Sequence, residues 1–143
     1  MGFKNLKESW IFPGQASQKV GMGADLYENT KLGKDYYDLA NYILGFDIKD
    51  ISFNGPNERL KMTEFTQPAI FIVSTIMSHL LLENGHSPSG VAGHSLGEYS
   101  ALAAVKGIDY ETGLELVKIR SNSMAKAGAL IPGTMAAVIG MNK

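Results

Sequence analysis

The sequence predicts an α/β protein in which a parallel sheet is flanked by helices. Residues 9–12 form a short apolar run that ends at Pro13-Gly14, which is typical of a buried strand entering a loop. A second strand of small residues, 89–92, runs into a helix through a Gly-x-Ser-x-Gly turn. Helical periodicity dominates the chain between and after these strands, and this alternation indicates the α/β class.

Length and composition restrict the classes of function. At 143 residues the chain can bury a core but is short for a complete α/β enzyme, so we expect one domain or part of one. Its 13 Lys and Arg against 14 Asp and Glu give a net charge of -1 with no basic block, which argues against nucleic acid as a partner. The lack of cysteine excludes disulfides and thiolate metal sites and fits a reducing cytoplasm. We expect a soluble protein without a membrane partner, because no signal-peptide core follows Met1 and the longest apolar run, 69–73, is far too short to cross a bilayer.

The first half of the chain yields one strand, one loop and two clear helices. The strand at 9–12 leads into a loop, after which apolar residues at helical spacing predict a helix over 35–44 that ends at Gly45. We expect residues 46–65 to form a surface excursion with a short helix near 58–62. Thr66-Gln67-Pro68 has the pattern of a helix start, with Thr as the cap, and Gly85 supplies the stop of a largely buried helix.

The second half predicts one strand and two helices, followed by a new strand. A helix from Leu96 to about residue 105 is rich in Ala and Ser and closes at Gly107, and its small residues allow close contact with the sheet. Asp109 can cap the next helix, which we expect to end at Gly128, with Gly113 as a weak point. Residues 134–139 are apolar and strand-like.

The Gly93-His94-Ser95-Leu96-Gly97 turn carries the strongest chemical signal in the sequence. A serine between a strand and a helix sits in a tight backbone conformation, and flanking glycines remove the Cβ atoms that would collide there. Ser95 is therefore the candidate nucleophile. The N–H groups of the first helical turn lack intrahelical partners, so the Leu96 N–H can receive an oxyanion formed beside Ser95.

Other polar residues have ordinary structural interpretations. His94 adjoins Ser95, but consecutive residues at a strand end point in different directions, which favours a structural histidine. His79 lies on an apolar helix and His86 in a loop, and for Gln67 we favour a structural role over one in the site. No cluster has the spacing of metal ligands.

In the sequence as a whole, the chain resembles the acyltransferase family of fatty acid and polyketide synthesis, which includes malonyl-CoA:acyl carrier protein transacylase. The features that carry the likeness are Phe12-Pro13-Gly14-Gln15-Ala16-Ser17-Gln18, Thr66-Gln67-Pro68-Ala69, Gly93-His94-Ser95-Leu96-Gly97-Glu98 and Arg120. The likeness spans nearly the whole chain but only the N-terminal half of such an enzyme. It implies that residues 1–133 begin an α/β hydrolase-like subdomain and that residues 134–143 open a small ferredoxin-like subdomain.

The resemblance also implies a reaction, in which a serine takes malonyl from coenzyme A and passes it to the phosphopantetheine thiol of acyl carrier protein. Ser95 is then the nucleophile, the N–H groups of Gln15 and Leu96 form the oxyanion hole, and Arg120 binds the malonyl carboxylate. No cofactor is held tightly, because malonyl-CoA is a substrate and the partner carries the phosphopantetheine. The family's general-base histidine lies beyond residue 143, so we expect the chain alone to be inactive.

Some alternatives remain open at this level. Ala16 stands where the family usually has glycine, which would cost about 1 kcal/mol if the position requires positive φ. Periodicity alone describes Arg120 as an ordinary solvated helix residue. A serine esterase or lipase shares the same turn, and a non-catalytic fragment that needs a complementary segment is a further possibility. A start close to the first strand favours a stand-alone protein over a synthase component.

Overall fold

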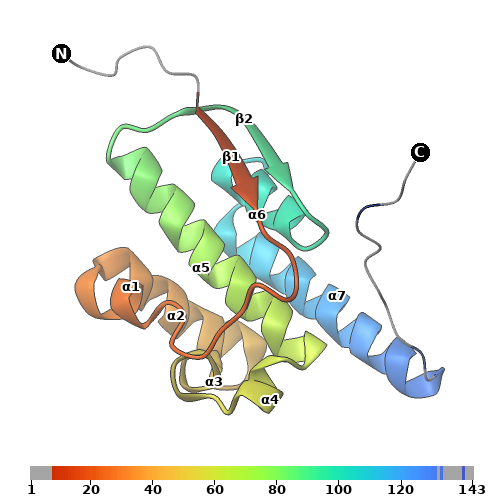
Figure 1. Cartoon of the computed structure of the whole chain (residues 1–143). Coiled ribbons are helices and arrows are strands. Elements are labelled where there is room, and N and C mark those ends of the chain that lie inside the picture. The colour runs from red at the N-terminus through yellow and green to blue at the C-terminus, as the bar shows by residue number, and fades with distance from the viewer. Residues whose placement is uncertain (1–7, 132, 134–139, 141–143) are drawn as a thin grey trace.

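The computed structural model describes residues 8–131, 133 and 140, which form a two-stranded parallel sheet packed on helices (Figure 1). The strands are β1 (Glu8–Phe12) and β2 (Pro88–Gly93). The helices are α1 (Ala24–Asn29), α2 (Lys31–Leu44), α3 (Ile48–Asn54), α4 (Asn57–Leu60), α5 (Thr63–Glu83), α6 (Gly97–Ala104) and α7 (Tyr110–Leu130). The α/β class is thereby confirmed.

The register of the sheet brings two loops to one edge. Phe12 at the end of β1 pairs with Gly93 at the end of β2, and the His94 N–H donates to the Phe12 carbonyl at 3.0 Å. Because parallel strands end at the same edge, the loop after β1 and the turn after β2 are neighbours. These are the two segments that the sequence singles out as chemical.

Helix α5 is the centre of the main core, and α7 packs along it (Figure 1). Gly113 of α7 lies against Phe71 of α5, where an added Cβ would be 2.6 Å from the phenyl Cζ atom. The residue that we expected to weaken α7 is therefore a close-packing contact inside a continuous helix. Asp109 caps this helix as predicted, because its carboxylate accepts the Thr112 N–H at 2.7 Å.

Three helix boundaries differ from the sequence prediction. Helix α5 begins at Thr63 instead of Thr66, and the Thr66 hydroxyl donates to the Leu60 carbonyl instead of capping. Pro68 thus lies inside the helix. Helix α7 continues through Gly128 to Leu130, and α2 begins at Lys31, because the Thr30 side chain caps it. The Thr30 cap is a local signal that the prediction missed, and α7 passes through Gly128 although residues 126–131 are exposed.

The interpretation of residues 46–65 as a surface excursion is wrong. Helix α3 begins at an Asp47 cap whose side chain accepts the Asp50 N–H, and it buries Ile48 and Ile51 in the main core. Leu60 of α4 is fully buried there as well. These helices are too short to show a convincing periodicity, and their apolar residues become core only through contacts with distant segments. The sequence does not predict helix α1 either.

Helix α5 is the one described helix whose length and apolar composition would allow it to cross a membrane. Two-thirds of its most apolar stretch is buried inside the molecule (67%), which is what a central core helix requires. The strand predicted at 134–139 lies outside the described residues, as does the domain boundary placed there.

Candidate active site

The turn between β2 and α6 holds Ser95 in a strained backbone conformation. Its φ is 55°, in the left-handed region that few residues other than glycine adopt. Both flanking glycines are required sterically, since an added Cβ would overlap the backbone of Gly97 and Glu98 at Gly93, and the carbonyl of Phe12 at Gly97. The side chain of Ser95 is exposed while Leu96 is buried, so the turn presents the serine hydroxyl to the outside.

The loop after β1 is pressed against this turn. An added Cβ on Gly14 would lie 2.6 Å from the His94 carbonyl oxygen, which puts the next residue, Gln15, beside the turn. Within residues 8–131, the backbone N–H groups of Gln15 and Leu96 donate to no protein acceptor. Both donors lie on the two segments that meet at this edge of the sheet, the loop after β1 and the turn after β2.

Ala16, at the position where the family usually has glycine, adopts a positive φ. Its φ is 88°, a conformation that costs an alanine about 1 kcal/mol relative to glycine. The loop offsets this cost with two internal hydrogen bonds. The Ala16 N–H donates to the Gln18 side chain, and the Ser17 hydroxyl donates to the Gly14 carbonyl, each at 2.8 Å.

Arg120 reaches Ser95 from α7. Its Nη2 atom donates to the Ser95 hydroxyl oxygen at 2.9 Å, and its Nη1 atom donates to Gln67 Oε1 at 2.5 Å. The guanidinium carbon also lies 5.9 Å from the centre of the Tyr99 ring, at a distance where a cation–π attraction acts. Arg120 is thus held at the serine by three elements, and the alternative of an unattached, solvated helix residue does not describe it.

Gln67 is the site residue whose function the sequence did not reveal. It is 1% exposed on the central helix α5, and it uses both ends of its amide: Oε1 accepts from Arg120, while Nε2 donates to Met124 Sδ at 3.3 Å. The available signal was a polar amide in an apolar helix, since a buried amide needs partners. The partners themselves, 53 and 57 residues away, could not be identified from local pattern.

None of the three histidines hydrogen-bonds to Ser95 within the described residues. The ring of His79 lies between the Tyr36 hydroxyl at 2.7 Å and the Ala103 carbonyl at 3.2 Å. His86 pairs with Glu8 at 3.0 Å, and this contact is the main reason why the pKa of the Glu8 carboxyl is lowered. His94 is exposed at the turn with its ring near Gly14.

The residues searched for metal ligands, which are those that the structure describes, contain no group of three His, Asp or Glu side chains able to hold an ion.

Fold and site together define an α/β protein with an exposed serine at a strand–helix turn and an arginine bound to it. A family model described as the acyl transferase domain matches residues 9–142. The chain belongs to this family.

Named relatives agree with the family assignment. The chain is 46% identical over 134 residues to the malonyl CoA-acyl carrier protein transacylase of Synechocystis sp., a match that covers 94% of this chain and 44% of the relative. It is 43% identical over 137 residues to the polyketide biosynthesis malonyl CoA-acyl carrier protein transacylase PksC of Bacillus subtilis, with 94% of this chain and 45% of the relative covered. The chain thus spans less than half the length of the relatives it matches.

Solved structures show the same likeness in three dimensions. The crystal structure of the Synechocystis sp. malonyl-CoA:ACP transacylase superimposes with a TM-score of 0.81 at 47% identity, covering 85% of this chain and 41% of that one. A malonyl-transacylase solved in complex with its type II polyketide synthase acyl-carrier protein gives a TM-score of 0.79 at 38% identity, with 85% and 40% covered.

Proposed function

We propose that the chain supplies the acyl-binding part of a malonyl-CoA:acyl carrier protein transacylase. The observation that carries the proposal is the 2.9 Å contact between Arg120 Nη2 and the Ser95 hydroxyl oxygen. In a malonyl ester of Ser95, only two carbon atoms separate the ester oxygen from the free carboxyl carbon. A guanidinium that contacts the serine oxygen is therefore within reach of that carboxylate.

In the proposed first half-reaction, the Ser95 oxygen attacks the thioester carbonyl of malonyl-CoA while its proton passes to a general base. The carbonyl oxygen becomes an oxyanion that the N–H groups of Gln15 and Leu96 can receive. Collapse of this intermediate expels the coenzyme A thiolate and leaves malonyl on Ser95. In the second half-reaction the phosphopantetheine thiol of acyl carrier protein attacks the ester and restores the serine.

Arg120 gives the proposed site its preference for an acyl group with a free carboxylate. A planar guanidinium binds a carboxylate with two parallel hydrogen bonds. An acetyl group offers no partner for this charge, so the site stabilises acetyl transfer less than malonyl transfer. A serine esterase needs no such arginine, which is why we favour the transferase over a lipase or esterase with the same Gly-x-Ser-x-Gly turn.

The general base belongs to the part of the domain that the chain does not span. In the described residues none of the three histidines hydrogen-bonds to the Ser95 hydroxyl. We therefore propose that the chain works together with the remaining portion of the acyl transferase domain, in the cytoplasm, with malonyl-CoA and acyl carrier protein as substrate and partner and no tightly held cofactor. Without that portion it is a non-catalytic fragment.

The test uses a hybrid enzyme, in which this chain is joined to the part of the Synechocystis sp. relative that lies beyond the match. We expect malonyl-CoA to add one malonyl group to the hybrid by intact mass and Ser95→Ala to abolish the adduct. A malonyl adduct on the Ser95→Ala variant would sink the assignment of the nucleophile.

A second measurement addresses the carboxylate. Arg120→Ala should lower malonyl loading of the hybrid far more than acetyl loading, because only malonyl loses a charged partner. Equal losses for the two acyl groups would rule out the anchoring role of Arg120 while leaving that of Ser95 intact.

A further inference from the structure

The sulfur atom of Met124 is the last member of a short chain of hydrogen bonds that begins at Ser95. Met124 lies about one turn after Arg120 on α7, and its Sδ atom accepts the Gln67 Nε2–H at 3.3 Å. The other end of the Gln67 amide accepts from Arg120, which also donates to the Ser95 hydroxyl. Among the described residues, this is the one hydrogen bond in which a methionine sulfur is the acceptor.

Arg120 and Met124 together fix the direction of the Gln67 amide. Gln67 is 1% exposed, so its amide depends on protein partners. The guanidinium only donates, so the amide oxygen has to face Arg120 and the amide nitrogen is left to face the sulfur. A thioether is a weak and neutral acceptor. A chemical change at this sulfur therefore acts directly on the group that holds Arg120.

Small reagents can reach Met124. Its side chain is half-buried and lines an open groove of about 790 Å³ between the start of α5 and the last turns of α7. Met62, which is 49% exposed, lines the α5 side of the same groove. Hydrogen peroxide is much smaller than malonyl-CoA, so a site that malonyl-CoA enters also admits peroxide.

We propose that Met124 is a site of reversible oxidation by peroxide and that its sulfoxide lowers the preference of the site for malonyl. The inference rests on the proposed function. In the oxidation, a lone pair of the sulfur attacks one oxygen of hydrogen peroxide and the O–O bond breaks. The thioether is oxidised to the sulfoxide, while the second oxygen leaves as hydroxide and takes the remaining proton of the first, so that peroxide is reduced to water.

The sulfoxide oxygen disturbs the arginine in either position that it can take. Met124 Sδ and Gln67 Nε2 are 3.3 Å apart, which leaves no space for another heavy atom between them, so an oxygen on that side displaces the amide. On another side, the oxygen is a polar acceptor one helical turn from Arg120, where it competes with the malonyl carboxylate for the guanidinium. Both positions weaken malonyl binding, whereas acetyl has no carboxylate to lose a partner.

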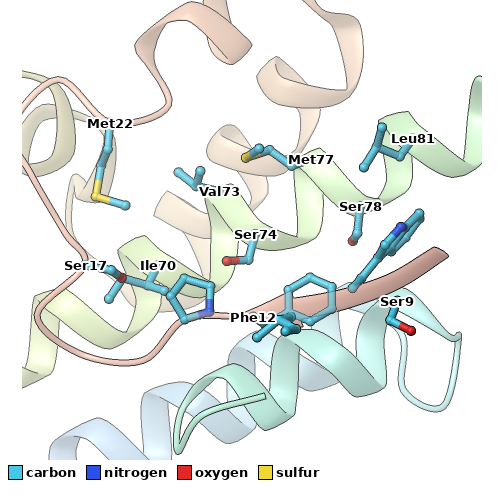
Figure 2. Close-up of a pocket in the computed structure, with 13 residues that line it drawn as sticks. Ser9, Phe12, Ser17, Met22, Ile70, Val73, Ser74, Met77, Ser78 and Leu81 are labelled. Carbon is cyan, nitrogen blue, oxygen red and sulfur yellow. The ribbon is translucent and has the colours of Figure 1, made fainter. Parts of the chain in front are cut away.

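Other methionines serve as internal controls. Met22 and Met77 border a groove of about 530 Å³ between β1 and α5 (Figure 2). Met77 is 52% exposed, so peroxide can reach it as well. In the part of the chain that the structure describes, neither these two sulfurs nor that of Met62 hydrogen-bonds to Gln67 or Arg120. Oxidation of several methionines is expected, and only that of Met124 should change acyl loading.

The test treats the hybrid enzyme with hydrogen peroxide and maps the oxidised residues by peptide mass. Malonyl and acetyl loading are measured by intact mass before and after treatment. We expect Met124 sulfoxide to lower the rate of malonyl loading about tenfold, the effect of losing a hydrogen bond to a charged group, and to change acetyl loading by less than about twofold. Methionine sulfoxide reductase with a thiol reductant should restore malonyl loading, whereas the thiol alone should not.

Two variants separate Met124 from every other oxidisable group. Met124→Leu removes the sulfur and should abolish the sensitivity of malonyl loading to peroxide, with each variant compared with its own untreated sample. Met62→Leu is the matched control, because Met62 lines the same groove, and it should stay as sensitive as the unsubstituted hybrid.

Three outcomes would overturn the inference and leave the proposed function standing: no sulfoxide at Met124, peroxide sensitivity that persists in Met124→Leu, or equal losses of malonyl and acetyl loading. A lack of malonyl loading by the untreated hybrid would overturn the proposed function and this inference with it.

Discussion

Gln67→Leu in the hybrid enzyme is the sharpest test of how Arg120 is positioned. The substitution keeps the approximate size of the side chain and removes the acceptor of the 2.5 Å hydrogen bond from Arg120 Nη1. A hydrogen bond to a charged group contributes about 1.5 to 3 kcal/mol. Because the Arg120 side chain is only half-buried, water can replace part of this bond, so we take the lower end, about 1.5 kcal/mol.

That free energy corresponds to about a tenfold fall in the rate of malonyl loading. Loading is measured by intact mass at short times with malonyl-CoA and with acetyl-CoA. We expect acetyl loading to change little, because acetyl has no carboxylate for Arg120 to bind. The melting temperature should also stay close to that of the unsubstituted hybrid, since leucine fits an apolar helix and Arg120 can turn toward water.

Gln67→Glu is a companion variant, which keeps an oxygen acceptor for Arg120 and loses the amide donor to Met124. Its carboxylate adds a negative charge that competes with the malonyl carboxylate for the guanidinium, so malonyl loading should again fall more than acetyl loading. The reasoning is refuted if Gln67→Leu lowers malonyl and acetyl loading equally, or if it lowers both only in proportion to a loss of folded protein. In either case Gln67 would be an ordinary core residue.

The remaining predictions concern the stability of the chain itself. Gly113→Ala should destabilise it by about 1 to 3 kcal/mol in urea unfolding, despite the higher helix propensity of alanine, because the new Cβ would press on Phe71. A stabilising effect would show that the contact between α5 and α7 is loose. Asp47→Ala should cost about 1 kcal/mol through loss of the α3 cap. The Asp50 N–H also holds the pKa of Asp47 below its ordinary value, so this contribution is complete above the unfolded-state pKa and disappears as the pH falls through the folded-state pKa. The urea midpoint of the unsubstituted chain should therefore fall more steeply at acidic pH than that of Asp47→Ala. Equal declines in the two midpoints would contradict this linkage.

Sequence reasoning succeeded where local chemistry decides the structure. The turn from Gly93 to Gly97 needs glycine at both ends, because a Cβ at either position would overlap backbone atoms. Strand β1 ends just before the Pro-Gly pair and β2 ends at this turn, as the sequence predicts. The Asp109 cap is equally local. These features depend on contacts between residues a few positions apart, or on steric rules that hold in any protein.

Long-range packing explains the failures at α3 and at Arg120, whereas the start of α5 involves a contact only six residues apart. Ile48 and Ile51 look like part of an irregular stretch until α3 is placed against the core. Helix α5 starts early because the Thr66 hydroxyl finds the Leu60 carbonyl. The hydrogen bond between Arg120 and Gln67 joins two helices across 53 residues, and the local sequence of neither helix predicts it.

The close approach of Gly113 to Phe71 has a consequence for the other end of the same helix face. Arg120 follows Gly113 by two helical turns, about 10 Å along α7, and its partner Gln67 precedes Phe71 by one turn on α5. The lack of a side chain at 113 therefore allows the close spacing of α5 and α7, and the position of the Arg120 guanidinium relative to Gln67 depends on that spacing. A larger residue at 113 would push α7 away from α5, and the Arg120 guanidinium would move away from the Ser95 hydroxyl. In the proposed site, acyl preference would therefore depend on a residue that is buried between two helices.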